Sequence, residues 1–160
     1  MHVRRYKPSE ERAIWDVYYG STRNVVATRY TADQVKRWAP DNYDDAGWTA
    51  RLQRSNPFVA VCDDQVVGFA ELLENGQIDY FYCHHEHQRK GIGTALMQAV
   101  ISDALKLGVN TLKASVSLTA VDFFRSHGFE IIAETNKIIC GAPAPQFQMS
   151  MTIHGQLRAV

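Results

Sequence analysis

The chain has 160 residues, 46% of them hydrophobic, with 17 basic and 17 acidic residues. This length suits one domain with a sizeable core, so we expect a single domain over residues 1–160. The formal net charge of zero argues against a general nucleic-acid binder, which would carry a basic excess.

No segment of the sequence has the pattern of a signal peptide or a membrane span. Basic residues follow Met1 without an apolar run behind them, and no apolar stretch approaches the roughly 20 residues that a membrane helix needs. Cys62, Cys83 and Cys140 are far apart and odd in number, which is typical of buried reduced thiols. We therefore expect a cytoplasmic protein that does not bind a membrane.

The first third of the chain contains signals for one short strand and three helices. Gly20 is expected to end the first helix, and Thr31-x-x-Gln34 is a capping box for the second, which must stop near Pro40. The strand is expected at residues 3–6 and the helices at residues 8–19, 31–39 and 44–54.

Three antiparallel strands should follow, because turn signals at Asp63-Asp64 and Asn75-Gly76 separate apolar runs. A helix should then run from Ile92 to Leu107, with Gly108 at its C′ position, and a two-turn helix should begin at a capping signature of Thr119 and Asp122. Residues 141–145 should connect the last two strands. The strands are expected at residues 58–62, 65–72, 78–83, 111–117, 130–139 and 146–153. The inner face of the long helix should comprise Ile92, Ala95, Leu96, Ala99, Val100, Ala104 and Leu107.

The turn between the strand at residues 78–83 and the long helix has the features of an anion site. Its glycines, Gly91 and Gly93, permit positive φ and let a phosphate approach the backbone, where unpaired N–H groups and the helix dipole face outward. Arg89 and Lys90 add positive charge beside it. The spacing fits neither a P-loop nor the Gly-x-Gly-x-x-Gly dinucleotide pattern, and an ordinary strand-to-helix turn is the alternative interpretation.

A second motif follows the glycine turn at a definite distance. Gln88-x-x-Gly91-x-Gly93 and Ala120-x-x-Phe123-Phe124-x-x-x-Gly128-Phe129 together resemble the GCN5-related N-acetyltransferase (GNAT) superfamily, over residues 3 to about 151. The resemblance implies an α+β fold with a mixed, mostly antiparallel sheet, helices on both faces and a V-shaped split between the fourth and fifth strands. It also implies transfer of an acetyl group from acetyl-CoA to a primary amine of a small molecule or an exposed protein amine.

The resemblance further implies where acetyl-CoA binds. Backbone groups of Tyr82, Cys83 and His84 would hold the acetyl-pantetheine arm, and Phe124 would pack against it. The pyrophosphate would be held by Gln88, Arg89, Lys90, Gly91, Ile92, Gly93 and Thr94.

Amine acetylation needs a base, because only the neutral amine attacks the thioester. Family members often carry Glu or His on this strand, nine residues before the start of the glycine turn, and Asp79 occupies that place. Asp79 would need desolvation or a water relay to accept a proton near neutral pH. Gln77 and Glu71 are further candidates, and a purely structural hydrogen-bonded carboxylate is the alternative for Asp79.

The family's usual general acid is a Tyr, and Phe124 stands at that position. A phenyl ring donates no proton, so three interpretations stay open. In the first, Ser117 donates a proton to the leaving group directly or through water. In the second, the CoA thiolate (thiol pKa about 8.5) leaves without a general acid, and in the third the protein is a weak catalyst. We favour the second, with Ser117 kept as a candidate catalytic residue.

His84, His85 and His87 surround Glu86, but their spacing does not fit a helical zinc motif, and no metal is expected. His84 and His85 are expected instead to flank the cofactor arm, and His84 is an alternative proton carrier. His127 precedes a glycine at a helix end, where a cation suits the dipole.

Aromatic residues crowd the first helical region, which in the family covers the acceptor side of the cleft. These aromatic residues do not identify the acceptor amine. A non-catalytic acyl-CoA-binding module and a nucleotide- or phosphate-binding domain are the alternative functions, and we expect a monomer or homodimer that binds no nucleic acid.

Overall fold

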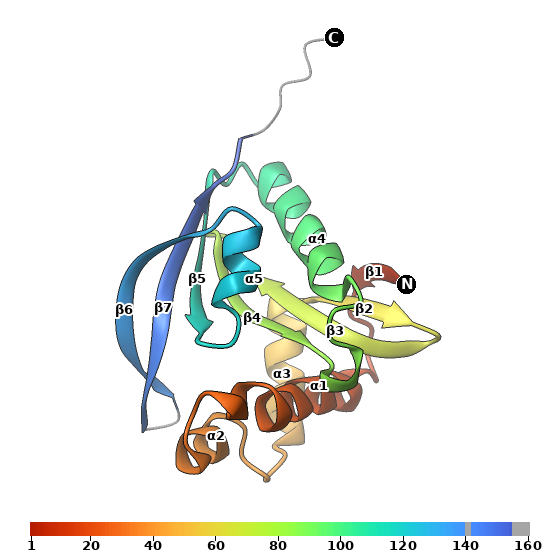
Figure 1. The fold of residues 1–160 in the computed structure, drawn as a ribbon. Coiled ribbons are helices and arrows are strands. Elements are labelled where there is room, and N and C mark those ends of the chain that lie inside the picture. The colour runs from red at the N-terminus through yellow and green to blue at the C-terminus, as the bar shows by residue number, and fades with distance from the viewer. Residues whose placement is uncertain (140–141, 155–160) are drawn as a thin grey trace.

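The computed structural model describes residues 1–139 and 142–154, which form one mixed sheet with helices around it (Figure 1). The seven strands lie in the order β1-β2-β3-β4-β5-β7-β6, and only β4 and β5 pair in parallel. The strands are β1 (His2–Arg5), β2 (Phe58–Cys62), β3 (Gln65–Leu72), β4 (Gln77–Cys83), β5 (Thr111–Ser117), β6 (Glu130–Ile139) and β7 (Ala142–Thr152). The helices are α1 (Glu11–Asn24), η1 (Val26–Thr28), α2 (Ala32–Trp38), α3 (Asp45–Ser55), η2 (His85–His87), α4 (Ile92–Lys106) and α5 (Val121–Ser126).

The sheet splits between β4 and β5. Their parallel pairing holds only where Gln77 faces Lys113 and Ile78 faces Ala114, and beyond these positions the two strands separate, as Figure 1 shows. The expected V-shaped split between the fourth and fifth strands is therefore confirmed.

A bulge in β4 lies where this split begins. Leu72 of β3 faces Ile78 and Ala70 faces Phe81, so three steps along β4 match two along β3. The extra residue falls at Asp79-Tyr80, and a bulge of this kind re-aims the side chains beside it.

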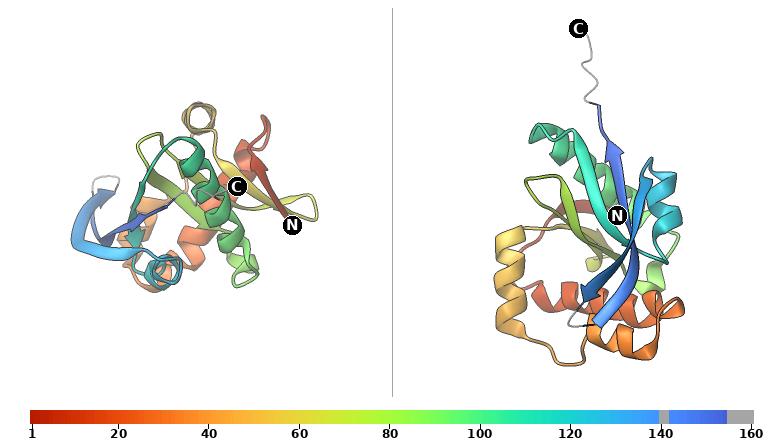
Figure 2. Two further views of the ribbon diagram at one scale, coloured as in Figure 1. Left: turned by 90° about the horizontal axis from the view of Figure 1, so that it is seen from above. Right: turned by 90° about the vertical axis from the view of Figure 1, so that its left-hand side faces the viewer.

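Apolar side chains fill both faces of the sheet. On one face α4 packs on β2 and β3, with Leu96, Val100 and Phe129 among the buried residues. On the other, α1 and α3 cover the sheet, with Ile14 and Leu52 fully buried (Figures 1 and 2). Helices on both faces are therefore confirmed.

Most expected elements are present with the expected limits or within a few residues of them. The Thr31–Gln34 capping box starts α2, and Asp44 caps α3 by accepting from the backbone N–H of Gly47 at 3.1 Å. The residues at Asp63-Asp64 both have positive φ, as a tight hairpin turn requires.

The expected end of the first helix at Gly20 is wrong, because α1 continues to Asn24. A Cβ at Gly20 would lie 2.7 Å from Nδ1 of His85. This glycine therefore makes room for the His85 ring and does not terminate the helix.

Two further expectations about helices are wrong. Leu107 is 52% exposed, whereas Met97, which the sequence pattern omitted, is buried. The N-cap of α5 is Ala120 without a side-chain hydrogen bond, because the hydroxyl of Thr119 pairs with that of Ser117 at 3.0 Å.

The last strand begins earlier than expected, at Ala142. Its prolines, Pro143 and Pro145, face β6 alone, since β5 pairs with β7 only from Gln146 onward. A strand with one free side tolerates proline, because a missing N–H there breaks no ladder bond. Cys140 lies outside the described residues; Cys62 and Cys83 are half-buried free thiols.

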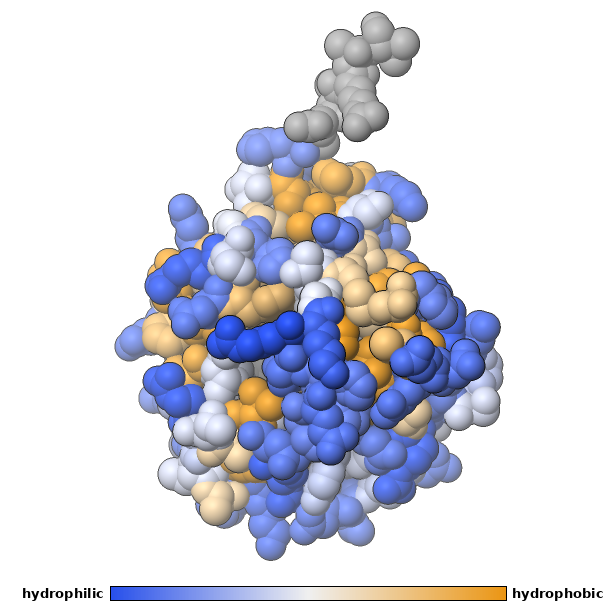
Figure 3. Space-filling model, turned by 45° about the vertical axis from the view of Figure 1, so that its right-hand side comes forward, coloured by the Kyte–Doolittle hydropathy of each residue, from blue (hydrophilic) through white to orange (hydrophobic). Residues whose placement is uncertain are grey.

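Within the part of the chain that the structure describes, no helix is long and apolar enough to cross a membrane. The face in Figure 3 mixes hydrophilic residues with several separate apolar areas.

Candidate acetyl transfer site

The glycine turn leaves backbone donors unpaired at the start of α4. Gly91 is the N-cap, with φ of 79°. The first hydrogen bond of the helix runs from the N–H of Ala95 to the carbonyl of Gly91 at 3.1 Å. The N–H groups of residues 91–94 donate to no other described residue. Together with the dipole of a 15-residue helix, these donors have the geometry that an anion site requires.

The two glycines of this turn have different roles. A Cβ at Gly91 would meet nothing within 4 Å, so the positive φ and the open space above it matter there. A Cβ at Gly93 would lie 2.8 Å from the ring of Phe123. Gly93 therefore lets α5 pack against the start of α4.

Gln88 fastens the turn with its side chain. Its Nε2 donates to the carbonyls of Cys83 and His84, both at 3.1 Å. Arg89, with φ of 59°, and Lys90 are exposed and form no ion pair with another described residue.

A cleft of about 520 Å³, here called the cofactor cleft, opens beside this turn between β4 and α5. The expected residues Tyr82, Cys83 and Phe124 line it, and His84 and Lys90 do not. Six residues of the glycine turn at residues 88–94 also line it: Gln88, Arg89, Gly91, Ile92, Gly93 and Thr94.

The backbone of β4 presents alternate residues to this cleft. The N–H of His84 donates to Val67 of β3 at 2.8 Å, so His84 and Tyr82 direct their backbone groups toward β3. Phe81 and Cys83 then face the side where β5 has separated. The expected backbone contacts of both Tyr82 and His84 with the cofactor are therefore corrected. Of the three expected residues only Cys83 keeps a free backbone, and Phe81, which the sequence interpretation missed, joins it.

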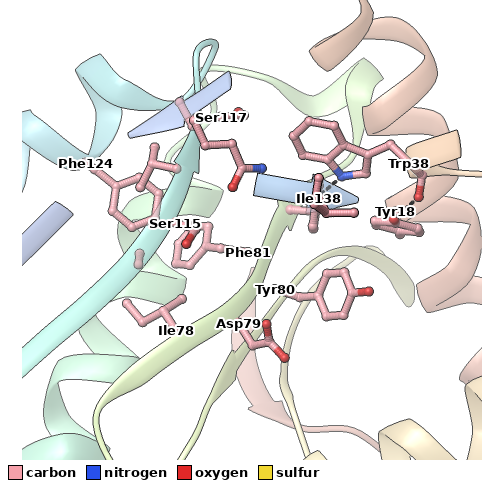
Figure 4. Close-up of a pocket in the computed structure, with 15 residues that line it drawn as sticks. Tyr18, Trp38, Ile78, Asp79, Tyr80, Phe81, Ser115, Ser117, Phe124 and Ile138 are labelled. Atoms are coloured by element: carbon pink, nitrogen blue, oxygen red, sulfur yellow. Dashed lines mark hydrogen bonds between the residues drawn. The ribbon is translucent and has the colours of Figure 1, made fainter. Parts of the chain in front are cut away.

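A second cleft of about 270 Å³, here called the acceptor cleft, lies where β4 and β5 diverge (Figure 4). Asp79 lines it from β4 and Ser117 from β5, and Trp38 and Phe124 lie at opposite sides. Five residues line both clefts and mark their junction: Phe81, Tyr82, Ser117, Ala120 and Phe124.

Asp79 belongs to a charge network that three elements assemble. Arg51 of α3 donates to Oδ2 of Asp79 at 2.6 Å and to the fully buried Glu71 of β3 at 2.8 Å. Ser55 donates to the other oxygen of Glu71 at 3.1 Å. Burial raises the pKa of Glu71, and Arg51 and Ser55 oppose this. Glu71 and Gln77 line neither cleft, which removes them as candidate bases.

Ser117 and Phe124 meet at the junction of the clefts. The Ser117 hydroxyl is hydrogen-bonded to Thr119 at 3.0 Å. The Phe124 ring is almost fully buried and contacts Phe81 edge to face, with centroids 5.6 Å apart. The position of the family's usual Tyr therefore offers no proton donor.

Aromatic side chains from α1, α2 and β4 wall the acceptor cleft. The hydroxyl of Tyr18 donates to the carbonyl of Trp38, whose Nε1 donates to the hydroxyl of Tyr82 at 3.0 Å. Burial raises the pKa of Tyr82 well above its usual value and that of Cys83 to about 11. Both groups therefore stay neutral near pH 7.

The histidines after β4 pack as rings. His84 and His85 stack with centroids 4.7 Å apart, because the chain turns into η2 there instead of continuing as a strand. Burial, with His85 and His87, lowers the pKa of His84. Among the described residues no three His, Cys, Asp or Glu gather as metal ligands would. His127 is the C-cap of α5, and its Nδ1 lies 3.0 Å from the carbonyl of Phe123.

A mixed sheet that splits between β4 and β5, with a glycine turn at the start of the following helix, defines the class of GNAT acyltransferase domains. The chain belongs to this family: the family described as "Acetyltransferase (GNAT) domain" matches residues 26–152.

Individual relatives agree with this assignment. The chain is 26% identical over 149 residues to the uncharacterized N-acetyltransferase YafP of Escherichia coli K12, covering 93% of this chain and 94% of YafP. A GCN5-related N-acetyltransferase structure from Rhodopseudomonas palustris superposes with a TM-score of 0.90, at 26% identity and 94% coverage of both chains. The yncA protein of Salmonella typhimurium, solved with its cofactor acetyl-CoA, has a TM-score of 0.69, at 20% identity, with 100% of this chain and 99% of yncA covered.

Proposed function

We propose that this protein transfers an acetyl group from acetyl-CoA to a primary amine of a small molecule or an exposed protein amine. One observation carries the proposal: a cleft beside an open helix N-terminus joins a cleft that holds a carboxylate, at the point where β4 and β5 part. The family assignment supports acyl transfer, and the acetyl-CoA complex of yncA supports acetyl-CoA as the donor.

Acetyl-CoA would lie along the cofactor cleft with its pyrophosphate on the N–H groups at the start of α4. The free backbone groups of Phe81 and Cys83 would pair with the pantetheine arm as a strand would. This brings the thioester to the junction of the clefts, where Phe124 offers an apolar surface.

The acceptor amine would enter the acceptor cleft and pair with Asp79. Arg51 holds Oδ2, and no described residue hydrogen-bonds to Oδ1. Oδ1 is therefore the atom that meets the ammonium and takes its proton, directly or through a water. The neutral amine then attacks the thioester carbon.

The tetrahedral intermediate collapses as the C–S bond breaks and CoA leaves as a thiolate. A thiolate is a fair leaving group and needs no dedicated acid. Ser117 lies at the junction and can donate a hydrogen bond to the sulfur, so we expect its removal to matter less than that of Asp79.

The test is release of free CoA thiol from acetyl-CoA across a panel of amines, beside a calorimetric titration with acetyl-CoA. We expect saturable binding together with amine-dependent thiol release. Phe124 favours one other function, a non-catalytic acyl-CoA-binding module, because it removes the usual proton donor. Saturable binding without thiol release with any amine would favour that module.

A further inference from the structure

Gln146 places an unused hydrogen-bonding group in the acceptor cleft. It is only 5% exposed, it lines the cleft, and its Oε1 has no hydrogen-bond partner in the described part of the chain. A buried polar atom without a partner destabilises a fold, and in native proteins such an atom ordinarily meets a ligand or water. The side-chain amide can rotate to offer oxygen or N–H₂, so it can pair with a donor or an acceptor.

The other neutral polar groups of this cleft already have partners in the protein. Hydroxyl and indole groups are engaged as follows: Tyr18 with the carbonyl of Trp38, Trp38 with Tyr82, Ser115 with Gln148, and Ser117 with Thr119. Two side-chain oxygens of this cleft, Oε1 of Gln146 and Oδ1 of Asp79, have no hydrogen-bond partner among the described residues. A ligand would therefore be recognised at two polar points.

The charge of the cleft selects against an acidic ligand. Asp79 lines it, and among the residues that the structure describes no Lys, Arg or His does. Arg51, which contacts Asp79, is already shared with Glu71. A ligand ammonium has a counter-ion here, whereas a ligand carboxylate would be desolvated without one.

The remaining wall is apolar and largely aromatic, and the cleft is small. Its apolar lining includes Trp38, Phe81, Phe124 and Ile138. A dry cavity of about 150 Å³ holds benzene, so about 270 Å³ accommodates one ring with a short chain.

We infer that the acceptor is a small primary amine without a carboxylate, with a flat apolar body and one hydrogen-bonding group that pairs with Gln146. This inference rests on the proposed acetyl transfer and names its substrate class. Gln146 is then a specificity residue, and Asp79 receives the ammonium.

Three matched amines test the inference: tyramine, phenethylamine, which lacks the hydroxyl, and tyrosine, which adds a carboxylate. Two readouts are needed, kcat/KM from thiol release and the affinity of each amine for the protein saturated with CoA. We expect tyramine to exceed phenethylamine by about tenfold and tyrosine by at least about a hundredfold in both.

Gln146→Leu should erase the preference for tyramine over phenethylamine and leave the acetyl-CoA affinity unchanged, since Gln146 does not line the cofactor cleft. Gln146→Met serves as a second variant if the first folds poorly. Gln98→Leu is the control, because Gln98 is exposed on α4 and lines neither cleft.

The inference is overturned if tyrosine is used as well as tyramine, if none of the three amines binds the CoA complex, or if a folded Gln146 variant keeps the tenfold preference. Failure of the proposed function looks different. In that case the amines bind the CoA complex in the expected order, but acetyl-CoA releases no thiol.

Discussion

At the scale of single residues, Gly91 and Gly108 form a natural pair. They stand at the two ends of α4 with φ of 79° and 74°, and a Cβ at either would meet nothing within 4 Å. A side chain at either position therefore carries the same backbone strain of about 1–2 kcal/mol. Only Gly91 adjoins the unpaired N–H groups.

We expect Gly91→Glu to weaken acetyl-CoA binding by at least about a hundredfold, because a carboxylate would occupy the anion site. Gly108→Glu should lower the stability of the fold by a similar amount but leave the affinity for acetyl-CoA unchanged. Calorimetry and thermal unfolding of both variants measure the two effects. Equal acetyl-CoA affinities in the two variants would refute a pyrophosphate site at residues 88–94.

Asp79 is the residue on which the proposed proton transfer depends. Asp79→Asn keeps the shape of the side chain but removes the base, so turnover should fall by about a hundredfold or more while acetyl-CoA affinity stays within about twofold. Asp103→Asn is the control, since Asp103 also pairs with an arginine, Arg5, at 2.8 Å and lines neither cleft. An unchanged rate in Asp79→Asn would exclude Asp79 as the base.

At the scale of elements, the ion pairs of Arg51 tie α3 to β3 and β4 behind the acceptor cleft. Arg51→Met would leave the fully buried Glu71 without its cation and should cost about 3 kcal/mol near neutral pH. Burial raises the pKa of Glu71, and losing Arg51 raises it further. A carboxylate with a raised folded pKa stabilises the fold when protonated, and this contribution is lost as pH rises through that pKa.

The loss in Arg51→Met should therefore be largest near about pH 7 and smaller near about pH 5. Denaturant unfolding at both pH values measures it. The double variant Glu71→Gln, Arg51→Met lacks the buried charge and should show little of this pH dependence. If the single variant loses the same stability at both pH values, Arg51 acts through packing and not through charge.

The tip of the β6–β7 ribbon shows another contribution of elements to the site. Tyr30 donates to the carbonyl of Pro145 at 2.6 Å, and Gln34 donates to that of Pro143 at 3.3 Å. The region around α2 thus satisfies the carbonyls of the ribbon beyond the end of β5. These contacts hold Gln146 and Ile138 over the acceptor cleft.

At the scale of the whole molecule, the cofactor cleft lies between the two halves of a divided sheet. The halves are joined across β4 and β5 by only two paired positions, and both halves line the cleft. Acetyl-CoA at about 100 times its Kd should raise the free energy of unfolding by about 2.7 kcal/mol. This corresponds to a rise in Tm of about 5–10 °C for a chain of this size. ATP at the same concentration should give much less. If ATP raises Tm and acetyl-CoA does not, the chain is a nucleotide- or phosphate-binding domain.

The sequence by itself determined the features that depend on neighbours along the chain. The limits of β2, β3, β5 and β6 follow from apolar runs between turn residues, and the capping box at Thr31 and Gln34 needs only one helical turn. The glycine turn at residues 88–94 was evident for the same reason.

The tertiary structure decided what depends on residues far apart in the chain. Gly20 lies inside α1, where the absence of a side chain leaves room for the ring of His85. Asp79 meets Arg51 only because α3 packs behind the bulge in β4. Oε1 of Gln146 reaches the acceptor cleft because β7 pairs with β5 beside Ser117. Periodicity and capping act over a few residues, whereas strand pairing and packing bring distant side chains together, so the acceptor cleft exists only in the folded chain.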